Sequence, residues 1–77
     1  MNTKHENTYR KLKFNITYTR KMQGLSQLQL AERIGISRTH MSNIEAPNSS
    51  IGLSLDVLFD IAAALDVPIS KLFDFRD

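Results

Sequence analysis

Apolar residues recur along this chain at intervals of three and four positions, the spacing of a helix that buries one face. The first such helix is predicted from Thr8 to Met22. Its core-facing positions are Tyr9, Leu12, Ile16 and Thr19. Gly24 follows, where a left-handed residue commonly ends a helix. No stretch alternates long enough to indicate a strand, so the pattern predicts an all-α protein.

A second apolar stripe runs along the other side of this first helix. It consists of Phe14, Tyr18 and Met22. We expect it to pack in the core against the last helix or the C-terminal segment. The alternative is a dimer or partner surface, because an exposed apolar patch marks an interface.

Two short helices follow, and both have start signals. Ser26 and Gln29 fit a capping box that opens the second helix, and Gly35 ends that helix. Ser37 can cap a third helix from Arg38 to about Ala46. The inward residues of the two helices are Leu30, Ala31, Ile34, Met41 and Ile44. Two helices joined by a tight glycine turn have the dimensions of a helix-turn-helix, here about residues 26–46.

The remaining chain predicts two more helices. Ser54 can cap a fourth helix that runs to about Leu65, and Pro68 suits the first turn of a fifth that ends near Phe73. The buried face of the fourth is predicted to be Leu55, Leu58, Ile61, Ala62 and Leu65. The expected architecture is a flexible N-terminal tail over residues 1–7 and one compact five-helix domain over residues 8–77.

Composition narrows the possible chemistry. A chain of 77 residues has material for one core, and without cysteine it has neither disulfides nor thiolate metal sites. His5 and His40 are far apart and lack acidic partners at metal-ligand spacing, so no metal or other cofactor is expected. No glycine-rich phosphate loop or nucleophile–base–acid set can be assembled, which argues against an enzyme.

Targeting signals are also missing from the pattern. The longest unbroken apolar run, Ile61 to Leu65, is far shorter than the ~20 residues that span a bilayer. Residues 1–7 are polar and lack the apolar stretch of a signal peptide. We therefore expect a cytoplasmic protein without a membrane partner.

Charge is distributed unevenly along the chain. Residues 1–45 carry eight Lys and Arg against three acidic residues, whereas residues 46–77 carry two against five. A basic half indicates a polyanionic partner. The outward face of the third helix adds short polar side chains and one arginine, and a major groove admits such a helix. That face consists of Arg38, Thr39, His40, Ser42 and Asn43.

The stretch Gly24 to Glu45, GLSQLQLAERIGISRTHMSNIE, resembles the Cro/lambda-repressor family of helix-turn-helix proteins, also called the XRE family. Ser54 to Val67 is similar to that family's fourth helix, and the resemblance extends from about Leu12 to Phe73. It implies a lambda-repressor-like fold. It also implies a sequence-specific transcription regulator, a repressor or an activator, that binds double-stranded DNA.

The resemblance assigns roles to individual residues. Arg38, Thr39 and Asn43 match positions that reach base edges, and His40 and Ser42 match neighbouring base or phosphate positions. Gln27 matches a glutamine that bonds a phosphate. Arg20 and Glu45 match a partly buried pair that joins the first helix to the end of the third. Further phosphate contacts are expected from Ser37, at a helix N-terminus, and from Lys13 and Lys21.

After Glu45 the chain departs from the family pattern, because Ala46-Pro47-Asn48 replaces the usual glycine. This departure puts in question the phosphate contacts that the resemblance implies for the loop after the third helix.

Family members commonly pair through the fifth helix, so a symmetric homodimer on a palindromic operator is expected. The candidate interface residues are Phe59, Leu72, Phe73 and Phe75. Three other readings stay open on this fold. The residues 38–42 and the short chain also resemble restriction–modification controller proteins; the others are an antitoxin that masks a toxin and a pure protein-interaction module.

Overall fold

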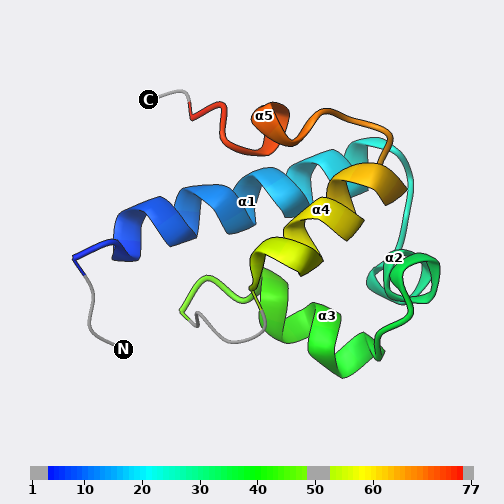
Figure 1. Ribbon diagram of the computed structural model, residues 1–77. Coiled ribbons are helices and arrows are strands. Elements are labelled where there is room, and N and C mark those ends of the chain that lie inside the picture. The colour runs from blue at the N-terminus through cyan, green and yellow to red at the C-terminus, as the bar shows by residue number, and fades with distance from the viewer. Residues whose placement is uncertain (1–3, 49–52, 76–77) are drawn as a thin grey trace.

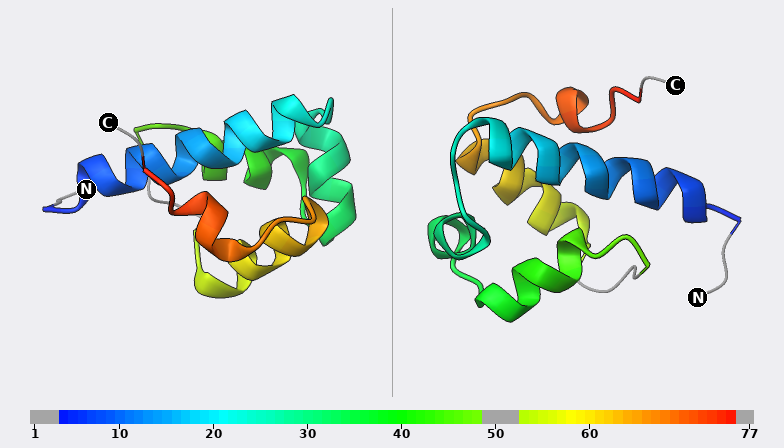
Figure 2. Two further views of the ribbon diagram at one scale, coloured as in Figure 1. Left: turned by 90° about the horizontal axis from the view of Figure 1, so that it is seen from above. Right: turned by 180° about the vertical axis from the view of Figure 1, so that it is seen from behind.

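The computed structural model describes residues 4–48 and 53–75 and contains, over those residues, helices and turns alone. The helices are α1 (Glu6–Met22), α2 (Gln27–Ile34), α3 (Arg38–Glu45), α4 (Leu55–Ala64) and α5 (Ile69–Leu72). The five-helix, all-α prediction is therefore confirmed. Figure 1 shows α3 and α5 on opposite sides of the molecule, with α1 and α4 between them, and Figure 2 shows the same order from behind.

One core joins all five helices. Its buried apolar members are Leu12, Ile16, Leu30, Ala31, Met41, Ile44, Leu58, Ile61, Ala62, Leu65 and Leu72. Most positions predicted to face inward are among them, because the three- and four-residue spacing identifies the buried side of each helix. Leu55 is an exception, since it is the first residue of α4 and its side chain is exposed.

Leu72 corrects the predicted dimer interface. Its exposed fraction is 0%, and it belongs to the core rather than to a surface. α5 has only four residues and lies against α1 and α4. A single turn in that place directs its last leucine inward, so Leu72 is unavailable to a partner.

The stripe along α1 also differs from its expected place. Phe14, Tyr18 and Met22 are exposed by 65%, 54% and 68%, so the prediction that they pack in the core is wrong. The physical reason is the shortness of α5, which covers the core with Leu72 and reaches no further over α1. The stripe is a surface feature, as in the alternative interpretation.

The ends of the helices explain the chain path. α1 begins at Glu6, two residues earlier than predicted, and Arg10 pairs with Glu6 at 3.5 Å one turn on. Residues 1–3 of the predicted tail lie outside the described residues. The predicted caps of the next helices are confirmed: Ser26 and Gln29 form the capping box, and Ser54 accepts a hydrogen bond from the Val57 amide.

Three helices end in the same left-handed turn. Gly24 (φ 74°) follows α1, Gly35 (φ 77°) follows α2, and Asp66 (φ 57°) follows α4. In each case the next amide bonds back to a carbonyl five residues earlier, as in the Schellman motif: Leu25 to Arg20, Ile36 to Ala31 and Val67 to Ala62. The glycines were predicted here, but the aspartate was not.

Side chains from α1, from its C-cap Gln23 and from α2 satisfy carbonyls at the ends of α4 and α5. Gln23 Nε2 donates to the Leu65 carbonyl at 2.7 Å, and Arg33 Nη1 donates to the Ala64 carbonyl at 3.2 Å. Asn15 Nδ2 donates to the Leu72 carbonyl at 2.9 Å. The last carbonyls of a helix lack partners within it, so these contacts attach α4 and α5 to α1, its C-cap and α2.

Candidate nucleic-acid interface

The turn between α2 and α3 sets the direction of α3. Gly35 adopts its positive φ without steric cost, and the Ile36 amide bonds to the Ala31 carbonyl at 3.0 Å. Ala31 is fully buried, which allows α2 to pack closely against its neighbours. Ser37 then caps α3 by accepting a hydrogen bond from the His40 amide at 3.0 Å. The predicted helix-turn-helix thus has its local geometry in place.

α3 divides cleanly into an inner and an outer face. Met41 and Ile44 are fully buried, whereas the predicted base-reading face is open. The exposed residues of that face are Arg38, Thr39, Ser42 and Asn43, and His40 lies at its edge, half-buried. The exposed face presents hydrogen-bond donors and acceptors on one convex helix, which is the form that fits a major groove. The base contacts themselves stay predictions.

The N-termini of α2 and α3 add favourable places for phosphate. The first amides of a helix lack partners within it and carry partial positive charge, so they attract anions. Ser37 is exposed at the start of α3, and Lys21 is exposed in the last turn of α1. Both side chains lie at the surface, and their phosphate contacts stay predictions.

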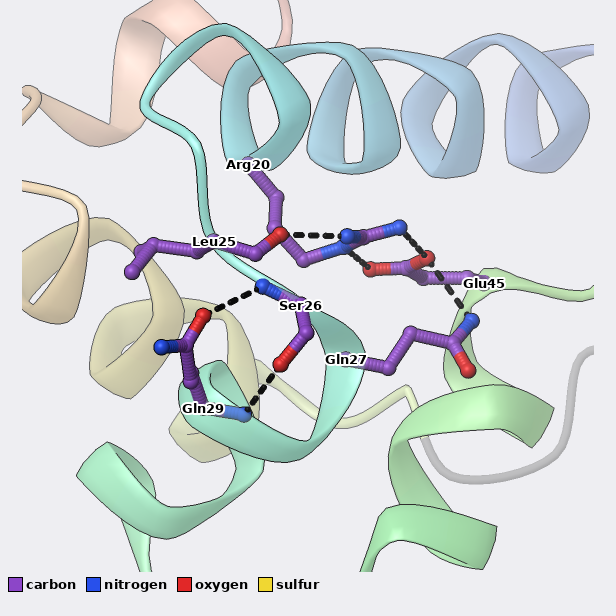
Figure 3. Close-up of polar contacts among 6 residues, drawn as sticks. All are labelled: Arg20, Leu25, Ser26, Gln27, Gln29 and Glu45. Atoms are coloured by element: carbon purple, nitrogen blue, oxygen red, sulfur yellow. Dashed lines mark hydrogen bonds and ion pairs between the residues drawn. The ribbon is translucent and has the colours of Figure 1, made fainter.

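Arg20 and Glu45 hold α1 against the end of α3. Arg20 Nε donates to Glu45 Oε2 at 2.7 Å and Nη2 donates to Oε1 at 2.9 Å, a two-pronged contact with both side chains buried. The third guanidinium nitrogen donates to the Leu25 carbonyl at 2.6 Å (Figure 3). The arginine therefore also fixes the turn that leads into α2.

Gln27 is tied into the same cluster. Its side-chain amide nitrogen donates to Glu45 Oε1 at 3.1 Å, so that one carboxylate oxygen joins α1, α2 and α3 (Figure 3). The residue is half-buried. Gln27 was predicted for its phosphate contact alone, and the carboxylate partner was missed because the two residues are 18 positions apart. This bond holds its amide in place, and its phosphate contact stays a prediction.

Lys13 corrects the predicted set of phosphate contacts. Its exposed fraction is 1%, and its ammonium group donates to the main-chain carbonyl of Asn43 at 3.2 Å. Desolvation by burial lowers its pKa below the usual lysine value. A cation beside a carbonyl near the end of α3 supports that helix from within the protein, so Lys13 is unavailable to DNA.

A signal for this burial was present in the sequence. Lys13 precedes Arg20 by seven residues, two helical turns, and so lies on the same face of α1. Arg20 was already predicted to face α3. The seven-residue spacing therefore indicates that the side chain of Lys13 faces α3 as well.

The loop after α3 begins at Ala46, whose extended backbone ends the helix. Pro47 and Asn48 follow at the surface, and residues 49–52 lie outside the described residues. Within the described ranges, no group of three acidic or histidine side chains gathers to hold a metal ion. Among residues 4–48 and 53–75, no helix is both long enough and apolar enough to cross a membrane.

Comparisons with known proteins agree with this geometry. The helix-turn-helix family matches residues 16–72. Among solved structures, the chain is similar to the restriction-modification controller protein C.AhdI from Aeromonas hydrophila, with 28% sequence identity and a TM-score of 0.81. That alignment covers 92% of this chain and 100% of the other. No curated protein sequence matches.

Proposed function

The chain belongs to the helix-turn-helix family, and from this premise we propose how it acts as a DNA-binding transcription regulator. α3 lies in the major groove of an operator and distinguishes its bases. Arg38, Thr39 and Asn43 contact base edges, and His40 and Ser42 contact the adjacent bases or phosphates. The observation that carries the proposal is the exposed polar face of α3 above a fully buried apolar one.

Phosphate contacts place α3 in the groove. Gln27 at the start of α2 and Ser37 at the start of α3 flank the recognition helix, and Lys21 adds a cation. Such contacts supply affinity that falls with salt but carry no sequence information. The α3 side chains supply the discrimination, and one bidentate arginine–guanine contact contributes about 1–3 kcal/mol.

The functional unit is a homodimer joined through α4 and α5. Leu55, Phe59 and Phe73 are exposed apolar residues there. Leu55 and Phe73 line a hollow together with Leu53 and Leu58. Phe75 is half-buried and lies on the α1 side of α5 instead. Two-fold pairing presents two recognition helices about 34–36 Å apart, which matches a palindromic operator.

Selection from a pool of random duplex DNA at moderate salt, followed by sequencing of the bound fraction, tests the proposal. We expect an enriched inverted repeat. Phe59→Asp should convert the protein to a monomer in sedimentation experiments and weaken binding to the repeat. The control is Phe14→Asp, at an exposed phenylalanine on α1, which should leave the dimer intact. Retention of DNA without an enriched sequence would contradict sequence-specific regulation.

A narrower role is favoured by one observation. The likeness to a restriction-modification controller protein spans nearly the whole chain, so the operator is a candidate control region of a restriction–modification operon. A methyltransferase gene and an endonuclease gene beside this one, with the selected repeat upstream of them, would support that role. Enrichment of a repeat found only elsewhere in the genome would exclude it.

A further inference from the structure

Lys13 contacts the main chain of α3 from inside the protein. Its side chain is on α1 with an exposed fraction of 1%, and its Nζ donates to the Asn43 carbonyl at 3.2 Å. Asn43 belongs to the last turn of α3 and is one of the exposed residues of its outer face. The same residue therefore has a side chain on the proposed DNA-reading face and a carbonyl that is held by a buried cation.

Pro47 explains why this carbonyl needs a partner from a side chain. In an α-helix each carbonyl accepts a hydrogen bond from the amide four residues later, and for Asn43 that residue is Pro47, which has no N–H. The Ala46 amide donates to the carbonyl instead, at 3.3 Å, which is longer than the usual distance of about 2.9–3.0 Å. The Lys13 ammonium supplies the donor that the proline lacks.

The chemistry of this contact favours a positioning role over a stabilising one. The partner of the ammonium is a neutral carbonyl oxygen rather than a carboxylate. Burying a charge against such a partner costs free energy, and an apolar side chain of similar volume would avoid that cost. The lysine adds something that an apolar side chain would not, namely a fixed place for the Asn43 carbonyl.

The other end of α3 is fixed by different groups. Ser37 caps that end by accepting a hydrogen bond from the His40 amide at 3.0 Å. Arg38 is next to this cap and five residues before Asn43. A change at Lys13 therefore acts on the last turn of α3 and leaves the first turn with its own support.

We propose that Lys13 is a positioning residue for base recognition, which acts through the Asn43 carbonyl to set the last turn of α3 so that the Asn43 side chain meets its base. This role rests on the proposed function, in which Asn43 contacts a base edge. It adds a determinant of specificity that never touches DNA. Lys13 and Pro47 act as a pair, because the proline creates the need that the lysine meets.

The test measures base preference one position at a time. The full chain is titrated at one salt concentration with the selected operator and with operators in which each base pair is replaced in turn. Asn43→Ala and Arg38→Ala first identify the base pair that each of these side chains reads. The preference at those two base pairs is then compared among variants.

The variants form a cycle with a matched control. Lys13→Met removes the ammonium and keeps the volume of the side chain, Pro47→Ala returns an amide donor to the Asn43 carbonyl, and the double variant combines both. Asn15→Ala is the control, because Asn15 is another α1 side chain that donates to a helix-end carbonyl, that of Leu72 in α5, at 2.9 Å. Circular dichroism verifies that each variant is folded at the temperature of the titrations.

We expect a local loss of discrimination. Lys13→Met should lower the preference at the Asn43 base pair by about fivefold or more and leave that at the Arg38 base pair unchanged. Pro47→Ala should have little effect alone and should restore the lost preference in the double variant. Asn15→Ala should leave both preferences unchanged, although it also removes a bond from α1.

The outcomes separate this role from the proposed function. An unchanged preference in Lys13→Met, an equal loss at both base pairs, or a loss that Pro47→Ala fails to restore would overturn the positioning role and leave sequence-specific binding intact. The same holds if Asn43→Ala changes the preference at no base pair. Equal binding of the native chain to every operator would overturn both proposals.

Discussion

The guanidinium of Arg20 and the carboxylate of Glu45 lie in parallel, joined by two hydrogen bonds of 2.7 and 2.9 Å, and both side chains are buried. Neither group reaches the outer face of α3, yet their contact determines where that helix lies relative to α1. Arg38, seven positions before Glu45 on the same helix, is exposed. The structure thus assigns the two arginines to different tasks, one inside the protein and one at its surface.

Arg20→Ala should destabilise the fold strongly. It leaves the Glu45 carboxylate buried without its cation, which costs about 3–5 kcal/mol. In a domain of this size, thermal unfolding followed by circular dichroism should show a melting temperature lower by more than about 10 °C. The double variant Arg20→Met/Glu45→Met should lose less stability than Arg20→Ala, because no buried charge remains. An unchanged melting temperature for Arg20→Ala would show that the pair contributes nothing.

Lys13 and Lys21 should differ in their effect on DNA binding. Lys21→Met should reduce the slope of log affinity against log salt by about 1 for each phosphate contact removed. Lys13→Met keeps the volume of the side chain and should leave that slope unaltered, since Lys13 is buried against Asn43. Titrations of labelled operator at four salt concentrations provide the slopes. A smaller slope for Lys13→Met than for the native protein would show that Lys13 contacts a phosphate.

Lys13 should also make the stability depend on alkaline pH. Burial lowers its pKa in the folded state, whereas the unfolded chain keeps the usual value. Between these two values the unfolded state binds more protons, so raising the pH favours the folded state. Below that window both states are protonated, and the cost of burying the charge is present in full.

This pH effect is measured as a difference. Urea unfolding of the native protein and of Lys13→Met, from about pH 7 to about pH 10, isolates the contribution of one group. The free energy of unfolding of the native protein should rise relative to that of the variant across the range. A constant difference would mean that the lysine has the same pKa in both states.

Asp66→Gly should stabilise the protein. Asp66 has a φ of 57°, where a side chain costs energy that glycine avoids, and α1 and α2 use glycine at the same place. We expect a gain of up to about 1 kcal/mol, partly offset by the greater freedom of glycine in the unfolded chain. The reverse control is Gly35→Ala, which should lose about 1 kcal/mol through its φ alone, because nothing lies within 4 Å of the added carbon. Chemical denaturation measures the free energy of unfolding of the native protein, Asp66→Gly and Gly35→Ala.

Local signals in the sequence predicted the helix-turn-helix well. The capping box at Ser26 and the glycine at position 35 act over a few residues, so their effect can be recognised without knowing the fold. The positive φ of Asp66 could not be recognised in this way, because aspartate is a less usual residue in that turn than glycine.

Contacts between distant segments were predicted less well. Leu72 was predicted at an interface and is buried, whereas Phe14 was predicted in the core and is exposed. Both differences arise because the position of α5 over α1 depends on packing across the molecule. Gln27 was recognised by the family resemblance, but its bond to Glu45 depends on how α2 and α3 cross. Lys13 was placed at the surface because lysine is rarely buried, although its spacing from Arg20 indicated otherwise.

The most direct test of the central claim, that α3 reads the operator, is a ratio of affinities measured at one salt concentration. The two duplexes are the selected site and a shuffled sequence of the same composition, and the proteins are the native chain, Arg38→Ala and Lys71→Ala as an exposed-cation control. The native ratio should be about 10³ or more. Arg38→Ala should reduce it at least tenfold with no change in melting temperature, because each half-site loses a contact of about 1–3 kcal/mol. A ratio for Arg38→Ala equal to that of the native chain and of Lys71→Ala would contradict the account.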